Sequence, residues 1–341
     1  MTPPGPALAL TMGEPAGIGA EITLAAWTAR DGRTPPFFAI DDPERLRRQA
    51  SALGVAADVR EIDDPAQAAA CFADALPVLP EPLPVPVVPG SPDPANAPAI
   101  LSSIRRAVAV ALAGRAAGVV TNPIHKRGLQ AAGFGHPGHT EFLSELTASR
   151  SAPAMMLACP GLRVVPVTVH LPLRAVAGAL SRDLIRHHGE VTAAALRKDF
   201  GIARPRLAAA ALNPHAGEEG MLGREERDII APALGDLRAA GIDIAGPLPA
   251  DTLFHAERRG DFDAVLCMYH DQALIPLKTL DFRHGVNITL GLPIVRTSPD
   301  HGTALDIAGQ GKADPASLIA ALGLAAEIAA RRGAAAPATV A

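Results

Sequence analysis

Three histidines occupy similar positions in the sequence, each at the end of a largely apolar run. His170 ends VPVTVH, His215 ends ALNPH and His270 ends VLCMYH. Such runs favour buried strands, so each histidine is expected at the carboxyl end of a strand. One histidine of this kind more often satisfies a buried group. Three in equivalent places favour a site where neutral imidazoles hold zinc or a similar divalent ion.

Asp271 follows the last of these histidines directly. A histidine that binds a metal usually needs a carboxylate or carbonyl to orient its ring, so Asp271 could orient His270 or supply a further oxygen ligand. The alternative is that Asp271 caps the helix that follows, and it could do both.

A second set of residues predicts an anion site. Lys278, Asn287 and Arg296 interrupt apolar segments between Leu277 and Asp306. The guanidinium fork fits phosphate or carboxylate, and lysine adds a point charge. A solvated surface would explain the same charges, but these segments are otherwise suited to burial. The pattern therefore favours a small phosphorylated substrate.

Two loops complete the candidate residues. In GHPGHTEFL, residues 135–143, Thr140 could cap a helix with His139 beside its positive end, or could cap it while His139 has no role. The loop GEPAGIG, residues 13–19, has neither the GK[ST] ending of a P-loop nor GxGxxG spacing. It predicts only a tight turn.

The elements that must position these residues alternate between apolar strands and helices. Asp42 and Pro43 suit a helix start, and Pro123 suits the first turn of another helix. Nine prolines between residues 77 and 98 predict an extended surface connection without a central strand. The pattern predicts an α/β protein whose parallel sheet is covered on both faces. The expected strands are 7–12, 37–40, 117–121, 154–159, 163–169, 206–212, 264–268 and 286–289, and the expected helices are 20–29, 42–53, 99–114, 182–199, 223–240 and 315–331.

Composition narrows the class of protein. The 341 residues include 31 Lys and Arg against 35 Asp and Glu, a net charge of −4, which argues against nucleic-acid binding through bulk charge. The length and the 48% hydrophobic content predict two domains. Three widely spaced cysteines, no signal peptide and no clean apolar stretch of membrane-spanning length predict a reduced, cytoplasmic protein without a membrane segment.

Several long sequence motifs resemble those of a known family. Their order and spacing are similar to those of the 4-hydroxythreonine-4-phosphate dehydrogenase family of vitamin B6 biosynthesis, from about residue 8 to 325. The residues that follow His215 differ from those more common in this family, which leaves the roles of Glu218 and Glu219 open. The strings are GEPAGIGAE, TNPIHK, GHTEFL, HLPLR, LNPHAGEEGMLGREE, GPLPADTLF, YHDQALIPLK and VNITLGLPIVRTSPDHGTALDIAGQGKAD.

The resemblance implies an isocitrate/isopropylmalate dehydrogenase-like fold with two α/β/α domains and an interdomain cleft. The first domain is expected to be discontinuous, residues 1–130 plus about 286–341, and the second to cover about 131–285. A homodimer is implied, with an active site shared between subunits and the third histidine supplied by the neighbouring chain.

The resemblance also implies residue roles. The metal ligands fall on His170, His215 and His270, which together with His139 are the expected catalytic residues. The substrate contacts fall on His139, Thr140, Lys278, Asn287 and Arg296. The metal could be zinc, magnesium or cobalt, and the coenzyme NAD or NADP.

The implied reaction oxidises 4-phosphohydroxy-L-threonine to 2-amino-3-oxo-4-phosphooxybutanoate, which loses CO2 to give 3-amino-2-oxopropyl phosphate. One alternative is a dehydrogenase of erythronate or threonate 4-phosphate. Another is a metal-dependent phosphohydrolase, although most two-metal hydrolases use bridging carboxylates. A protein that binds the phosphate ester without turnover is the non-catalytic alternative.

Overall fold

The computed structural model describes residues 5–136, 138–149 and 151–335. The chain divides into two compact units. Unit 1 comprises residues 1–151 and 292–330, and unit 2 comprises residues 152–291 and 331–341. Within the described residues, no helix has both the length and the apolar character that crossing a membrane requires.

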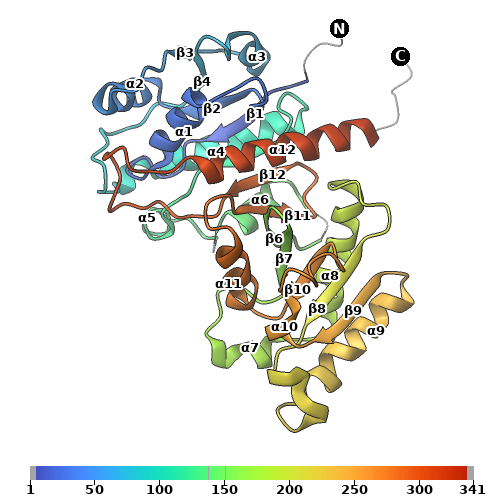
Figure 1. Ribbon diagram of the computed structural model, residues 1–341. Helices are drawn as coiled ribbons and strands as arrows, with labels where there is room; N and C mark the ends of the chain where they lie inside the picture. The colour runs from blue at the N-terminus through green and yellow to red at the C-terminus, as the bar shows by residue number, and fades with distance from the viewer. Residues whose placement is uncertain (1–4, 137, 150, 336–341) are drawn as a thin grey trace. The chain divides into compact units, whose positions relative to one another are not determined.

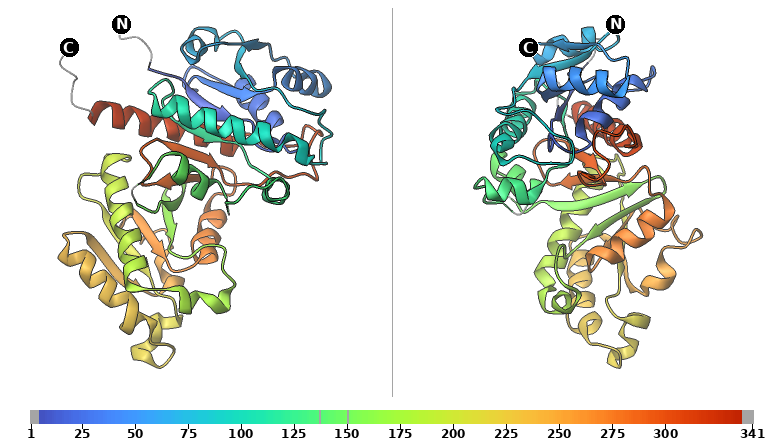
Figure 2. Two further views of the ribbon diagram at one scale, coloured as in Figure 1. Left: turned by 180° about the vertical axis from the view of Figure 1, so that it is seen from behind. Right: turned by 90° about the vertical axis from the view of Figure 1, so that its left-hand side faces the viewer.

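Unit 1 is built on a parallel sheet with strand order β3-β4-β2-β1-β5-β12. Helix α4 covers one face and α12 the other (Figures 1 and 2). From residue 331 onward, α12 is grouped with unit 2. The strands are β1 (Leu8–Thr11), β2 (Phe37–Asp41), β3 (Val59–Glu61), β4 (Leu76–Pro80), β5 (Val119–Thr121) and β12 (Arg296–Pro299), and the α-helices are α1 (Gly19–Thr28), α2 (Pro43–Leu53), α3 (Ala68–Cys71), α4 (Ala97–Leu112), α5 (Lys126–Ala131), α6 (His139–Leu146) and α12 (Ala316–Ala335).

Local chemistry explains where helix α2 begins and ends. The Asp42 side chain accepts a hydrogen bond from Arg45 N, and Pro43 occupies the first helical position, as the sequence predicts. Gly54 ends the helix with a φ of 64°, a conformation that glycine adopts without steric cost. The core of unit 1 is mostly aliphatic with a few aromatic side chains, and Phe38 and Ile104 are among its fully buried residues.

Unit 2 has strand order β11-β6-β7-β10-β8-β9. Strands β7, β10, β8 and β9 run parallel, whereas β6 pairs antiparallel with both β7 and β11. Helices α8 and α11 lie on opposite faces (Figure 2). The strands are β6 (Ala154–Cys159), β7 (Leu162–Pro166), β8 (Arg206–Ala210), β9 (Asp243–Leu248), β10 (Ala264–Cys267) and β11 (Val286–Leu290), and the α-helices are α7 (Leu173–Ala179), α8 (Arg182–Lys198), α9 (Ala231–Ala239), α10 (Ala250–Leu253) and α11 (His270–Leu280).

The expected α/β class is confirmed, but three local expectations were wrong. The proline-rich stretch contributes β4, which pairs with both β2 and β3, because a proline removes only its own amide donor and Val78 O still accepts from Ile62 N. Pro123 lies outside α5, which begins at Lys126. The sheet of unit 2 is mixed, because the tight connection between β6 and β7 forms an antiparallel hairpin.

The boundary between the units falls later than the sequence places it. The expected boundaries were 130/131 and about 285/286, whereas the compact units divide at 151/152 and 291/292. Helix α6 belongs to unit 1 because Phe142 is buried in its core and packs beneath Arg105 of α4, whose guanidinium lies 5.4 Å from the ring centroid.

Candidate functional site

The three predicted histidines follow three neighbouring strands of unit 2. His170 comes after β7, His270 after β10 and His215 after β8, and these strands lie side by side and parallel in the order β7-β10-β8. The carboxyl ends of parallel strands share one edge of a sheet, which is where ligands bind in such folds. The expected placement of the three histidines is confirmed.

His170 and His270 lie next to each other. Their ring centroids are 5.8 Å apart, with the rings inclined by 40°. Two imidazoles bound to one tetrahedral zinc through bonds of about 2 Å would have centroids roughly 5 Å apart, so the observed spacing suits a shared ion after a small adjustment. This pair is the strongest geometric feature of the candidate metal site.

The backbone around the candidate ligands is unusual. His170 has a φ of 53° and His215 a φ of 51°, in the left-handed region that non-glycine residues rarely adopt. Such conformations cost about 1–3 kcal/mol each and persist where the surrounding structure enforces them, commonly at functional sites. Both side chains are exposed.

His215 does not join the other two histidines in a preformed metal cluster. Over the described ranges of the chain, no group of three or more His, Cys, Asp and Glu side chains is arranged to hold a metal ion. The assignment of all three histidines to one ion stays a prediction.

Asp271 orients His270. His270 Nδ1 donates to Asp271 Oδ1 over 2.7 Å, which leaves Nε2 available as a ligand atom. Helix α11 starts at His270 with Tyr269 as its N-cap, so the alternative that Asp271 caps this helix was wrong. The donor set therefore fits a divalent metal: imidazole nitrogens, with one ring held by a carboxylate.

A pocket of about 550 Å³ lies beside His215 within unit 2. It extends to Tyr269, the residue before His270, and includes the carboxylate of Asp251. The sequence analysis did not single out Asp251 or Tyr269, although both stand in the family-like strings GPLPADTLF and YHDQALIPLK. The other lining residues are Leu173, Val176, Ala177, Leu212, Asn213, Pro214, Ala250 and Gln272.

Unit 1 holds two of the predicted substrate contacts, His139 and Arg296, close to each other. Arg296 is 4% exposed, and its Nη2 donates to Thr121 Oγ1 over 2.7 Å. Burial lowers the pKa of Arg296 to about 10, so the side chain remains a cation at neutral pH. Burial, followed by the charges of Arg296 and Lys126, holds the pKa of His139 well below its usual range.

These shifts make His139 a neutral imidazole close to a fixed positive charge. Its Nε2 is buried and has no hydrogen-bond partner among the described residues. Helix α6 begins at His139 with Gly138 as its N-cap. The expectation that Thr140 caps this helix was therefore wrong, because Thr140 already lies in the first turn.

Lys278 and Asn287 belong to unit 2. Lys278 lies in the last turn of α11, with its Nζ 5.6 Å from the ring centroid of Phe282. Asn287 lies in β11, where its buried Oδ1 has no hydrogen-bond partner among the described residues. Arg296 belongs to unit 1, so convergence of these three residues on one anion stays a prediction.

Unit 1 also holds buried charges that sequence reasoning missed. Burial raises the pKa of Asp41 to about 6, although Arg45 Nη2 lies 3.4 Å from its Oδ2 and opposes the rise. Burial also raises the pKa of Glu14, in the loop GEPAGIG. The only sequence signal was the position of Asp41 at the end of an apolar strand.

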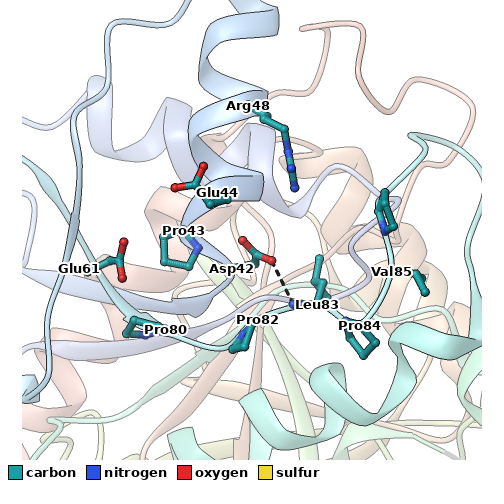
Figure 3. A pocket seen from close by; sticks show the side chains of 11 residues that line it. Asp42, Pro43, Glu44, Arg48, Glu61, Pro80, Pro82, Leu83, Pro84 and Val85 are labelled. Carbon is teal, nitrogen blue, oxygen red and sulfur yellow. Dashed lines mark hydrogen bonds between the residues drawn. The ribbon is translucent and has the colours of Figure 1, made fainter.

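A separate pocket of about 400 Å³ lies in unit 1 between α2 and the proline-rich stretch (Figure 3). Glu44, Arg48 and Glu61 provide its charges, and Asp42 Oδ2 accepts from Leu83 N over 3.0 Å at its floor. None of the predicted site residues lines this pocket.

Comparison with known proteins now places the chain. Residues 33–325 match the family described as Pyridoxal phosphate biosynthetic protein PdxA. The chain belongs to the PdxA family. A Caulobacter vibrioides protein named 4-hydroxythreonine-4-phosphate dehydrogenase is 59% identical over 331 residues, covering 96% of this chain and 98% of its own length.

Solved structures of PdxA relatives confirm the expected fold family. A 4-hydroxythreonine-4-phosphate dehydrogenase from Klebsiella pneumoniae has a TM-score of 0.87 and 40% identity, covering 96% of this chain and 99% of its own. A terephthalate 1,2-cis-dihydrodioldehydrogenase from Burkholderia xenovorans has a TM-score of 0.63 and 30% identity, covering 94% and 98%. The expected isocitrate/isopropylmalate dehydrogenase-like fold is therefore confirmed. The relatives named as dehydrogenases are oxidoreductases.

Proposed function

We propose that this chain oxidises 4-phosphohydroxy-L-threonine with NAD or NADP and a divalent metal, in pyridoxine 5'-phosphate biosynthesis. The product, 2-amino-3-oxo-4-phosphooxybutanoate, then decarboxylates to 3-amino-2-oxopropyl phosphate. The names of the PdxA relatives support the substrate. The observation that carries the chemistry is the set of three histidines after β7, β10 and β8, with His270 oriented by Asp271.

Bound metal and coenzyme supply Lewis acidity at the substrate hydroxyl and a hydride acceptor. His170, His215 and His270 would hold the metal, which could be zinc, magnesium or cobalt. Arg296, with its buried positive charge, would bind an anionic end of the substrate. Lys278, Asn287 and Thr140 are the remaining proposed substrate contacts.

His139 would act as a neutral hydrogen-bonding group. The pKa of His139 lies well below its usual range, so Nε2 can accept a proton or a hydrogen bond from substrate at neutral pH. The neighbouring Arg296 charge disfavours a lasting imidazolium, so a proton taken up by His139 would be passed on readily.

A second copy of the chain would complete the site. Seven of the nine large hydrophobic side chains that are exposed among the described residues lie in unit 2, within twelve residues of one of the three histidines. Exposed apolar groups scattered singly need no explanation, but this concentration favours an interface. We propose a homodimer that brings the third histidine from the neighbouring chain. The seven are Leu171, Leu173, Met221, Leu222, Ile275, Leu280 and Phe282.

The cellular compartment is also a proposal. Cys71, Cys159 and Cys267 are all free thiols, which suits a reducing compartment such as the cytoplasm.

The decisive experiment replaces His215 with Ala and measures metal content and NADH or NADPH formation together. We expect loss of bound metal and a fall in activity by about three orders of magnitude or more, as for removal of a group central to catalysis. Normal metal content and normal turnover in His215→Ala would contradict the metal assignment.

Substrate comparison separates the alternatives. We expect 4-phosphohydroxy-L-threonine to be oxidised faster than erythronate or threonate 4-phosphate. Phosphate release without coenzyme reduction would instead indicate a phosphohydrolase. Tight binding of the phosphate ester without turnover, with metal and coenzyme supplied, would indicate a binding protein.

A further inference from the structure

Glu226 is a buried carboxylate whose hydrogen bonds all reach the segment just before His215. Its side chain is 5% exposed. Its Oε1 accepts from Leu212 N over 2.8 Å and from Asn213 N over 2.7 Å, and its Oε2 accepts from Asn213 Nδ2 over 2.9 Å. Three donors on two successive residues are thus gathered on one carboxylate, and hydrogen bonds to a carboxylate are among the stronger kind.

Two glycines allow the loop to close around this contact. A Cβ on Gly217 would lie 2.6 Å from Glu226 Oε2, and a Cβ on Gly223 would lie 2.3 Å from Asn213 Nδ2. Both glycines have positive φ, 78° and 139°. The loop therefore packs directly on the Asn213 amide and the Glu226 carboxylate, and it begins and ends at these two residues.

The loop needs such support because its backbone is strained. Residues 215–219 all have positive φ, between 43° and 78°, and four of these five residues are not glycine. Each such residue costs about 1–3 kcal/mol, so the conformation persists only if its surroundings enforce it. Glu226 is a buried carboxylate that contacts two residues just before this run.

We propose that Glu226 is a positioning residue for metal binding: it holds the backbone at Leu212 and Asn213 so that the His215 imidazole is presented to the metal. Glu226 acts through His215 and does not itself touch the ion. This inference rests on the proposed function, because it assumes that His215 is a metal ligand.

The test compares Glu226→Gln with Glu225→Gln. Glutamine keeps the size of the side chain, but its amide group would face Asn213 Nδ2, donor against donor. Rotating the Asn213 amide would then place its oxygen against Glu225, which now accepts from Nδ2 over 2.7 Å. Glu225 contacts the same asparagine from a more exposed position, so Glu225→Gln is the matched control.

The readout is binding of Co²⁺ alone, followed by absorption or by competition with a chelator, together with thermal unfolding of the metal-free protein. We expect Glu226→Gln to weaken Co²⁺ binding by about 10- to 100-fold, the usual effect of losing an outer partner of a metal ligand. Glu225→Gln should stay within about twofold of the wild type. Excess Co²⁺ should restore turnover in Glu226→Gln, which a general loss of structure would not allow.

Asn213→Ala keeps the inference testable if Glu226→Gln does not fold. It removes the side-chain amide, which donates to both Glu225 and Glu226, but keeps the two backbone donors to Glu226. Because only one of the three hydrogen bonds to Glu226 is lost, Co²⁺ binding should weaken by up to about tenfold. The inference would be overturned if folded Glu226→Gln bound Co²⁺ with wild-type affinity. If Glu226→Gln does not fold, wild-type affinity in folded Asn213→Ala would overturn it instead. If the wild type itself binds no Co²⁺, or binds it equally after His215→Ala, the proposed function fails as well.

Discussion

The candidate metal ligands of unit 2 and the buried charges of unit 1 differ in their exposure to solvent. In unit 2, His170 and His215 follow their strands as exposed side chains on left-handed backbone. In unit 1, Asp41, Glu14 and Arg296 are at most 4% exposed. Unit 2 therefore presents its candidate ligands at the surface, whereas burial in unit 1 shifts the pKa values of its charged groups.

The two units show two ways in which a fold can prepare side chains for binding: by positioning them and by shifting their pKa values. The exposed candidate ligands would bind a metal mainly through their position, so backbone support matters most. Buried groups gain altered pKa values, at a cost in stability. Four substitutions sharpen or break this contrast.

The largest effect is expected for Arg296. Replacement by Ala should lower kcat/KM by about 100-fold or more, mainly through KM, because losing one member of a buried charge pair costs about 2–5 kcal/mol. Steady-state rates of coenzyme reduction measure this. Thr121→Val is the control, since it removes only the acceptor for Arg296 Nη2. A KM within twofold of the wild type in Arg296→Ala would exclude the residue from substrate binding.

The Asp41–Arg45 pair is expected to affect stability more than activity. Asp41→Asn should lower the free energy of unfolding by about 3 kcal/mol, because it leaves the buried Arg45 without its counter-charge. Asp41→Asn combined with Arg45→Leu should stay within about 1 kcal/mol of the wild type, since no buried cation is left and the introduced asparagine side chain can still accept from Asp42 N. Urea unfolding tests both, and an equal loss in the single and double variants would contradict the burial argument.

His139 is expected to contribute to the pH dependence of stability. The pKa of His139 is depressed in the folded state, so the unfolded chain binds more protons below its own pKa of about 6.5. The free energy of unfolding should therefore fall with decreasing pH, by at most about 1.4 kcal/mol per pH unit from this group. His139→Gln should remove this part of the slope between pH 6.5 and 5. Parallel curves for the variant and the wild type would show that His139 titrates normally.

The smallest effect on the fold is expected at Ile275 in unit 2. Its side chain is 63% exposed, so Ile275→Ser should change the free energy of unfolding by less than about 0.5 kcal/mol. Dimer dissociation, followed by sedimentation against concentration, should become about tenfold more favourable if this side chain is covered in the homodimer. Val88→Ser, at an exposed site of unit 1, is the control. Unchanged association in Ile275→Ser would remove this residue from the interface.

Much of the fold was predictable because it depends on local patterns. Continuous apolar runs predicted β1, β2 and β6 to within two residues, and Asp42 with Pro43 predicted the start of α2. Strand β4 was missed because its prolines argue against a central strand. Short β3 and polar β12 carry too little apolar pattern to be recognised.

The candidate site divides in the same way. The position of His170, His215 and His270 after strands follows from sequence, because a strand's carboxyl end is a local feature. Their neighbourhood does not, since the order β7-β10-β8 differs from the order along the chain. The hydrogen bonds from Asn213 to Glu226 were also unpredictable from the sequence, because they join residues thirteen positions apart across a loop with no periodic pattern.

The amino-acid order alone therefore settles which residue types are available, where each strand delivers them, and which family the chain resembles. Only the folded molecule decides that His170 lies against His270, that the pKa of His139 is depressed, and that Asp41 is paired in the core. The reason is physical: hydrophobic periodicity is set by neighbours in the chain, whereas desolvation and charge interactions depend on groups brought together from distant segments.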